Sequence, residues 1–137
     1  MVYQHHVRVL YGETDQMGVV HHGAYVAYLE EARTEWLREL GHPYGALEKA
    51  GIGLPVRNLS IRYRAAAHYE DHLVVTIWVE RLRAASITFG YPLRRVDEEA
   101  TLAQAEVELA CVSLAQRPLT AQALPAEIRA ALEATQQ

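Results

Sequence analysis

The chain has 137 residues, of which 50% are hydrophobic and 22% are charged. This composition is typical of one globular domain and argues against a disordered chain. The formal net charge of -4 argues against a nucleic-acid-binding protein, and the single cysteine, Cys111, excludes a disulfide within the chain. No secretory signal and no run of about 18 apolar residues occurs, so we expect a cytoplasmic protein without membrane insertion.

The first part of the chain predicts a strand, a loop and a long helix. β-branched and aromatic residues indicate a strand over 2–10, and residues 12–23 form a polar loop with several glycines. Apolar residues recur every three or four positions over 23–40, which predicts an amphipathic helix that ends at Gly41. A short helical turn is expected over 44–50.

The remainder predicts four strands and a terminal helix. The strands are expected over 56–63, 73–82, 87–94 and 103–111, and the short polar links suit antiparallel neighbours. A proline begins the short helix predicted over 125–134. We therefore predict a single α+β domain over residues 1–137, with a five-stranded antiparallel sheet wrapped around one long helix. One helix covers one face of such a sheet and leaves its edge strands open, so we expect a homodimer.

Several kinds of catalytic site are excluded because their motifs are absent. The sequence has no phosphate-binding loop, no dinucleotide-binding glycine motif, no serine nucleophile elbow and no zinc-protease helix. The seven histidines occur mainly as adjacent pairs or around a predicted turn, where neighbouring side chains diverge. We therefore expect no metal site and no cofactor.

The strongest candidate site is the loop that precedes the long helix. Asp15 places a carboxylate near the helix N-terminus, where it can attack a carbonyl or direct water against it while helix N–H groups hold the oxygen. His22 follows across a loop that Gly18 allows to turn. The alternative is structural: Asp15 caps a short turn, His22 caps the helix, and Tyr11 and Tyr25 are packing residues.

A spaced pattern runs from this loop into the helix. It consists of Tyr11, Thr14, Asp15, Gly18, Val19, Val20, His22, Tyr25, Tyr28, Glu30, Ala32 and Arg33. This pattern resembles the opening of the hotdog-fold acyl-CoA thioesterases of the 4-hydroxybenzoyl-CoA thioesterase superfamily, in particular the branch associated with the Tol–Pal system. Weaker similarity continues through Tyr63, Ala67 and the segment 69–71 to the Arg117-Pro118 and Leu124-Pro125 pairs.

The resemblance implies a hotdog fold, dimers with catalytic sites at the subunit interface, and pairing of dimers into tetramers. It places the family's catalytic carboxylate on Asp15, and the histidine and tyrosine of the Tol–Pal branch on His22 and Tyr11. It also implies that a backbone N–H at the His22 position holds the thioester oxygen.

The chain departs from the family pattern in the segment that follows Tyr63. Ala66 stands where the family has proline, and His68 stands where it has arginine. The basic residues that meet the CoA phosphates therefore remain open, and the candidates are Arg57, Arg62, Arg64 and His68.

We therefore predict an acyl-CoA thioesterase that converts an acyl-CoA and water into a carboxylic acid and free CoA. Asp15 is expected to act as nucleophile or general base, with the helix N-terminus near His22 and Gly23 as the oxyanion site. Gly18 and Tyr25 are expected beside the substrate. The alternatives are a non-catalytic acyl-CoA-binding sensor on the same fold, a hotdog dehydratase, and a structural partner of envelope proteins.

Overall fold

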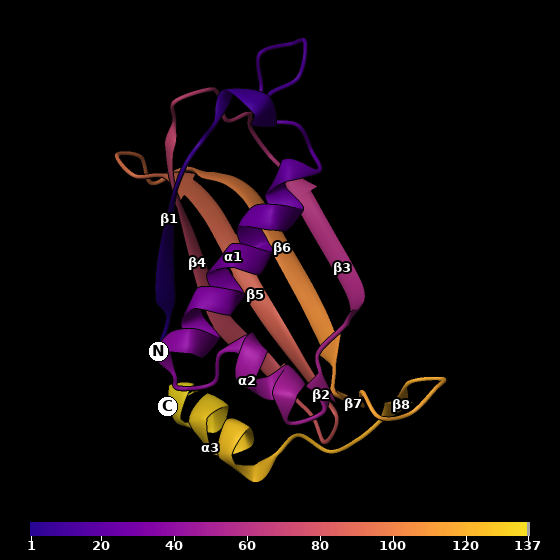
Figure 1. Ribbon diagram of the computed structural model, residues 1–137. Coiled ribbons are helices and arrows are strands. Elements are labelled where there is room, and N and C mark those ends of the chain that lie inside the picture. Colours follow the sequence, from indigo (N-terminus) through magenta and orange to yellow (C-terminus); the bar gives the residue numbers. More distant parts are fainter. Residues whose placement is uncertain (137) are drawn as a thin grey trace.

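Five long strands form one antiparallel sheet in the order β1-β4-β5-β6-β3 (Figure 1). The computed structural model describes residues 1–136, and Gln137 lies outside the described residues. The strands are β1 (Tyr3–Arg8), β3 (Val56–Tyr63), β4 (His72–Leu82), β5 (Ser86–Arg95) and β6 (Thr101–Ala110). Each contains a strand predicted from the sequence or lies within one, apart from shifts of one or two residues at the ends. The predicted α+β class with a five-stranded antiparallel sheet is confirmed.

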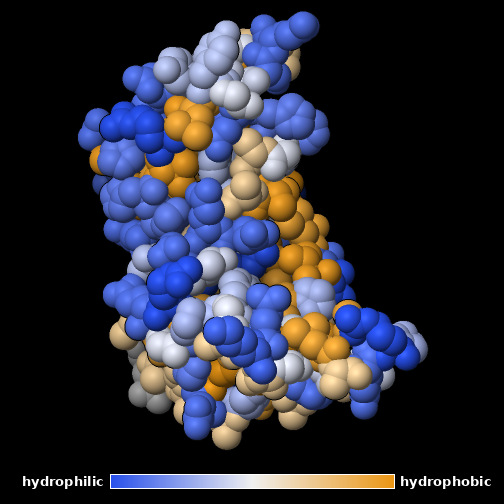
Figure 2. All heavy atoms as spheres, in the orientation of Figure 1, coloured by the Kyte–Doolittle hydropathy of each residue, from blue (hydrophilic) through white to orange (hydrophobic). Residues whose placement is uncertain are grey.

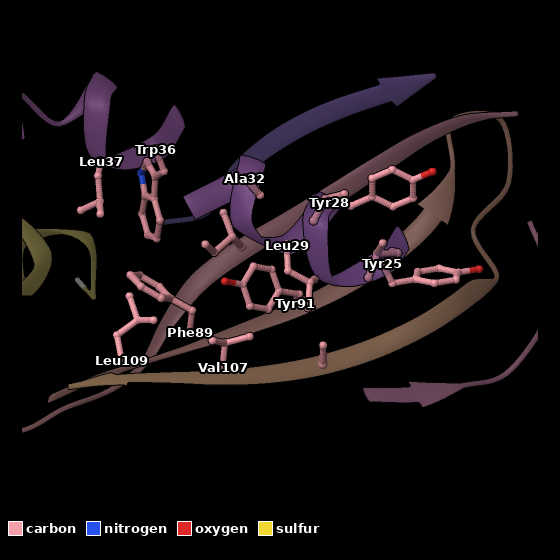
Figure 3. Close-up of a cluster of buried hydrophobic side chains, with 14 of the residues drawn as sticks. Tyr25, Tyr28, Leu29, Ala32, Trp36, Leu37, Phe89, Tyr91, Val107 and Leu109 are labelled. Carbon is pink, nitrogen blue, oxygen red and sulfur yellow. The ribbon is translucent and has the colours of Figure 1, made fainter. Parts of the chain in front are cut away.

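The long helix α1 (Ala24–Glu39) crosses one face of this sheet (Figure 1). Its buried residues recur at helical spacing, and they are Tyr25, Tyr28, Leu29, Ala32, Arg33, Trp36 and Leu37. Figure 3 shows the apolar and aromatic members of this set packed toward residues of β5 and β6. The rings of Trp36 and Phe89 have centroids 6.1 Å apart. The helix ends as predicted, because Gly41 adopts a φ of 94° that disfavours residues with a Cβ.

Alternation along the strands explains the two faces of the sheet. The residues buried beneath α1 include Leu73, Val75, Ile77, Phe89, Tyr91, Leu93, Val107 and Leu109. The opposite face carries ion pairs between strands, such as Arg57–Glu108 at 2.8 Å and Arg81–Glu106 at 2.9 Å. This pattern of apolar residues on one face and charged residues on the other is typical of an antiparallel sheet that is covered on one side.

Two short helices and a small second sheet complete the fold. Helices α2 (Tyr44–Lys49) and α3 (Ala126–Thr135) confirm the two predicted short helices. The three-stranded sheet of β2 (Ile52–Gly53), β7 (Val112–Ser113) and β8 (Thr120–Ala121) was not predicted. Its strands are two residues long, too short to show an alternating pattern. Within residues 1–136, no helix combines the length and the apolar character needed to span a bilayer.

Candidate active site

The loop between β1 and α1 is more ordered than a polar linker. It begins with the 3-10 helix η1 (Tyr11–Glu13), and the hydroxyl of Thr14 donates a 2.7 Å hydrogen bond to the carbonyl of Tyr11. Thr14 then pairs with Val20 in an isolated β-bridge. The residues between these two form a closed turn that carries Asp15.

Asp15 closes this turn with its backbone and with one carboxylate oxygen. Its N–H donates to the carbonyl of Val19, and its own carbonyl accepts from Gly18, both at 2.9 Å. Gly18 has a φ of 81°, so the turn requires the left-handed conformation that glycine adopts readily. Oδ1 of Asp15 accepts the N–H of Met17 at 2.9 Å and that of Val19 at 3.4 Å. The structural alternative, turn capping, is therefore present in this structure.

The same contacts leave the second oxygen of Asp15 available for chemistry. Oδ2 accepts no hydrogen bond from residues 1–136, and the side chain is only partly buried. No ion pair involves this carboxylate in the described part of the chain. Oδ1 thus fixes the orientation of the group, while Oδ2 can act as nucleophile or base.

The loop between β3 and β4 is hydrogen-bonded to the turn that carries Asp15. The N–H of Val20 donates to the carbonyl of Ala67 at 2.8 Å, and Val19 forms a β-bridge with His68. Arg95 holds this loop, because its Nη2 donates to the carbonyl of Ala66 at 2.6 Å and its Nε donates to Asp71 at 2.9 Å.

Asp71 is the carboxylate that binds Arg95 in the loop between β3 and β4. Burial opposes the charge of its carboxylate, but the N–H of His68 and the guanidinium of Arg95 outweigh burial and lower the pKa of Asp71 below its ordinary value. The N–H of His68 donates to Asp71 at 2.8 Å. The support beneath the Asp15 turn therefore depends on a negative charge at Asp71.

The N-terminus of α1 offers one open backbone donor beside this loop. The N–H of His22 has no acceptor among residues 1–136. The N–H of Gly23, in contrast, donates to Nδ1 of His21 at 3.0 Å, so only one of the two donors that we expected is free. The helix begins at Gly23 without a side-chain cap, which does not support the alternative that His22 caps it.

A cavity of about 290 Å³ lies next to this open donor. Its lining residues are Val19, Val20, His22, Tyr25, Tyr63, Arg64, Ala65 and Ala66. The walls are thus mostly apolar, with a histidine and an arginine among them. Of the predicted site residues, His22, Tyr25 and Arg64 line this cavity.

Tyr63 belongs to this cavity, although we did not select it as a site residue. Its hydroxyl donates to the carbonyl of His22 at 2.9 Å, and its ring meets that of Tyr25 edge-on at 5.1 Å. Burial raises the pKa of Tyr63, so the hydroxyl stays protonated as the donor. The only signal in the sequence was its place in the weaker family segment.

Asp15 and Gly18 reach the cavity through Val19 and do not line it themselves. Asp15 pairs with Val19 through two hydrogen bonds, and Val19 lines the cavity. Gly18 is exposed in the turn. Asp15 is therefore connected to the cavity through its hydrogen bonds with one lining residue, Val19.

The remaining predicted residues lie farther from the cavity. Tyr11 is 77% exposed, and its ring meets that of Tyr69 at 5.6 Å. The structure records no hydrogen bond between the side chains of Tyr11 and Asp15 in residues 1–136. Arg62 lines a different hollow, shared with Trp78 and Glu80.

Of the three other basic candidates, Arg57 is paired with Glu108 on the opposite face of the sheet, and the remaining two lie around the cavity loop. Nη2 of Arg64 donates to the side chain of Gln104 at 3.2 Å. The side chain of His68 is 57% exposed, and its Nδ1 lies 3.9 Å from Asp71. No cluster of three or more residues with metal-ligating side chains occurs in residues 1–136.

This arrangement suits addition of a nucleophile to a carbonyl group. An apolar cavity can take the carbon chain, an N–H without an acceptor at a helix start can hold the carbonyl oxygen, and a carboxylate is held in the turn that is hydrogen-bonded to the cavity residue Val19. Such an arrangement is suited to a hydrolase.

Comparison with known proteins gives the family. Residues 9–132 match the family model described as the thioesterase-like superfamily. The acyl-CoA thioesterase YbgC of Haemophilus influenzae is 39% identical over 127 residues, which cover 91% of this chain and 90% of that protein. The chain therefore belongs to the thioesterase-like superfamily, and the recognition of a thioester hydrolase is confirmed.

Two further similarities extend this result. The putative acyl-CoA thioesterase YneP of Bacillus subtilis is 38% identical over 85 residues, and the match covers 62% of each chain. The crystal structure of a DHNA-CoA thioesterase from Staphylococcus aureus superposes with a TM-score of 0.91 at 26% identity, covering 98% of this chain and 91% of that chain. The hotdog fold predicted from the sequence is confirmed.

Proposed function

We propose that this protein hydrolyses acyl-CoA thioesters, with Asp15 as the catalytic carboxylate. The observation that carries the proposal is the pairing of Asp15 with Val19, which lines the cavity together with His22. Oδ1 of Asp15 is held by backbone N–H groups while Oδ2 is not. The names of the two relatives, an acyl-CoA thioesterase and a putative acyl-CoA thioesterase, support the substrate class.

The thioester oxygen is held at the start of α1. The N–H of His22 donates to the developing oxyanion, and the positive end of the helix dipole adds to the stabilisation. One donor of this kind is typically worth about 2.7–4 kcal/mol at the transition state. Because Gly23 donates to His21, we place the donor at His22.

Asp15 can complete the reaction in two ways. In the first, Oδ2 attacks the carbonyl carbon, CoA leaves as its thiolate, and water then hydrolyses the mixed anhydride. In the second, Asp15 removes a proton from a water molecule that attacks directly. In both, the side chain of His22 positions water or protonates the thiolate. The expected role of Tyr11, to orient Asp15 or the acyl group, has no support from a side-chain contact with Asp15 among the described residues.

Oxygen-18 water under single-turnover conditions tests the anhydride route. Label that appears in the Asp15 carboxylate supports the anhydride, because the labelled oxygen enters when water attacks the Asp15 carbonyl carbon of that intermediate. Label confined to the product acid is given both by the general-base route and by attack of water on the acyl carbon of the anhydride, so only label in Asp15 selects between the routes. Mass spectrometry of the peptide that contains Asp15 detects that label.

Binding of the CoA phosphates is assigned to the basic residues near the cavity. Arg64 is the strongest candidate, because it lines the cavity and, among residues 1–136, its guanidinium is held only by the side chain of Gln104. His68 is the second, since it is exposed on the loop that supports the Asp15 turn. Arg62 lies at a different hollow, so it contributes only through the partner subunit or another route of the CoA chain.

A homodimer formed through β3 explains the exposed apolar surface. β3 is an edge strand, and most of its residues are exposed. Figure 2 shows a band of apolar side chains on the side where Figure 1 places β3, and Val26, Val56 and Tyr63 are exposed. Open strand edges and apolar patches favour association. Sedimentation analysis measures the mass of the protein in solution. A mass of 15.4 kDa at all concentrations contradicts the dimer, and a mass four times as large supports the tetramer.

We also propose the finer assignment to the Tol–Pal-associated branch and a cytoplasmic location, and residues of the site support only the first of these. His22 and Tyr11 occupy the positions that distinguish that branch in the sequence pattern. Only a partner-capture or localisation experiment in the source cell tests these two points.

Release of free CoA distinguishes the proposed function from the sensor alternative. A panel of short, long and aromatic acyl-CoAs is incubated with the protein and a thiol-reactive dye. A thioesterase gives a dye signal that is proportional to enzyme and time for at least one acyl group. A sensor, a dehydratase or a structural protein releases no CoA from any of them.

A further inference from the structure

Glu13 connects three parts of the molecule at the loop that carries Asp15. Its Oε1 accepts two hydrogen bonds of 2.8 Å, from the N–H of Leu10 and from the hydroxyl of Tyr28. Its backbone carbonyl accepts the N–H of His21 at 2.7 Å. Glu13 therefore joins the end of β1, the helix α1 and the segment just before the open N–H of His22.

Tyr28 is the fixed end of this connection. It is fully buried in the core, and Figure 3 shows its ring on α1 beside that of Tyr25. The two rings meet edge-on with centroids 5.9 Å apart. Burial and the neighbouring Glu13 raise the pKa of Tyr28, so its hydroxyl remains a donor to the carboxylate. The hydroxyl of the buried Tyr28 thus holds the carboxylate of Glu13 in place.

The donors that Glu13 accepts differ from those that Asp15 accepts. Oε1 of Glu13 accepts from the hydroxyl of Tyr28 in the core and from the N–H of Leu10. Within the described chain, the side chain of Asp15 accepts only from N–H groups of its own turn, those of Met17 and Val19. Each carboxylate keeps a second oxygen without a hydrogen bond among residues 1–136, but of the two only Glu13 connects the loop to the core, which suits it to hold the loop.

The loop is consequently anchored on both sides of Asp15. On one side Glu13 binds Tyr28, and on the other Val20 binds Ala67. A reacting group that is misplaced by about 1 Å can lose about 10²-fold in rate. The anchor at Glu13 is the one that reaches the helix whose N-terminus offers the oxyanion donor.

We propose that Glu13 and Tyr28 are positioning residues for the hydrolysis, which hold the Asp15 turn and the start of α1 in one geometry. This inference rests on the proposed role of Asp15. It assigns the carboxylate of Glu13 the role of hydrogen-bond acceptor, for which its negative charge is secondary. A glutamine side chain keeps an oxygen at the same place and can accept both bonds.

The test compares three variants with one control under saturating acyl-CoA. Glu13→Ala is expected to lower kcat by about 10- to 100-fold, with KM changed by less than about threefold. Glu13→Gln is expected to restore kcat to within about threefold of the wild type, because the acceptor is kept. Tyr28→Phe is expected to lower kcat by about 3- to 10-fold. Glu99→Ala, an exposed change between β5 and β6, is the control and is expected to leave kcat unchanged.

The double variant Glu13→Ala/Tyr28→Phe tests whether the two residues act through one bond. Its loss of kcat is expected to equal that of Glu13→Ala alone, since the same hydrogen bond is removed in both. Additive losses contradict this coupling. Circular dichroism and sedimentation of each variant show that fold and association are kept.

Three results overturn the proposal: wild-type kcat in Glu13→Ala, wild-type kcat in Tyr28→Phe, or a loss in Glu13→Gln as large as that in Glu13→Ala. If Glu13→Ala fails to fold, the Tyr28→Phe and Glu13→Gln rates decide alone, because both keep the shape of the side chain. A different result would contradict the proposed function itself, namely that the Asp15→Asn variant keeps its hydrolytic activity. Loss of activity in Asp15→Asn together with a fully active Tyr28→Phe rejects only the positioning role.

Discussion

The hydroxyl of Tyr63 donates a 2.9 Å hydrogen bond to the backbone carbonyl of His22. This bond joins the end of β3 to the segment that begins α1, and it fixes His22, which lines the cavity and whose N–H has no acceptor among residues 1–136. β3 is an edge strand, so the geometry of the helix start depends on a strand that we assign to the dimer interface.

Tyr63→Phe is expected to lower kcat/KM by about 2- to 10-fold, because a hydrogen bond typically contributes about 0.5–1.5 kcal/mol. The ring contact with Tyr25 is kept in this variant, so stability changes little. Tyr3→Phe is a matched control, since Tyr3 stacks on Trp36 at the other end of α1. Equal activity of both variants and the wild type contradicts a role for Tyr63.

His22→Ala is expected to lose less activity than Asp15→Asn. The variant keeps the backbone N–H that we assign to the oxyanion, and it removes only the side chain that positions water or protonates CoA. General acid–base groups typically contribute about 10²-fold or more, so a loss near the lower end of that range is expected. Measurement of kcat/KM for both variants with one acyl-CoA decides; a larger loss in His22→Ala reverses the two roles.

Gly18→Ala is expected to lower the free energy of unfolding by about 1 kcal/mol, because Gly18 has a φ of 81°. A Cβ at this position meets no atom within 4 Å, so the cost comes from the backbone alone. Gly12→Ala is the control: its Cβ is equally unobstructed and its φ is not in the left-handed range. Urea denaturation of both variants measures the difference, and equal stabilities rule out backbone strain at Gly18.

Stability at acid pH is expected to depend on Asp71. Because the pKa of Asp71 is lowered in the folded state, its contribution is fully present above the unfolded-state pKa of about 4. That contribution is lost as the pH falls through the lower folded-state pKa. Asp71→Asn is therefore expected to be less stable than the wild type at pH 7, with a gap that narrows toward pH 2. Asp97→Asn, in an exposed turn, serves as the control; a gap that is constant with pH contradicts the assignment.

The long elements could be predicted because their periodicity is repeated over many residues. The stripe of α1 and the alternation of β6 each extend over ten or more positions, and burial follows the same period in both. The apolar runs of β4 and β5 are as long, and burial is continuous over the first six residues of β5. The strands β2, β7 and β8 have two residues each. They are defined by pairing with distant segments, which a local pattern does not contain.

The candidate site was predicted in part for the same reason. Asp15 and His22 could be found because they belong to one continuous loop, and the resemblance to a family placed roles on them. The loop geometry could not be predicted, because it depends on Ala67, Arg95 and Tyr28, far away in sequence. The anchor Glu13 was missed because its acceptor role appears only when Tyr28 lies opposite it.

The central claim, that Asp15 is the catalytic carboxylate, is tested most directly by the rate of CoA release from Asp15→Asn. Asparagine keeps an oxygen for the N–H of Met17, so fold and association are expected to be unchanged. We expect this variant to lose most of the turnover of the wild type on the best acyl-CoA of the panel. Wild-type turnover in a preparation that mass spectrometry shows to be free of deamidated protein contradicts the account.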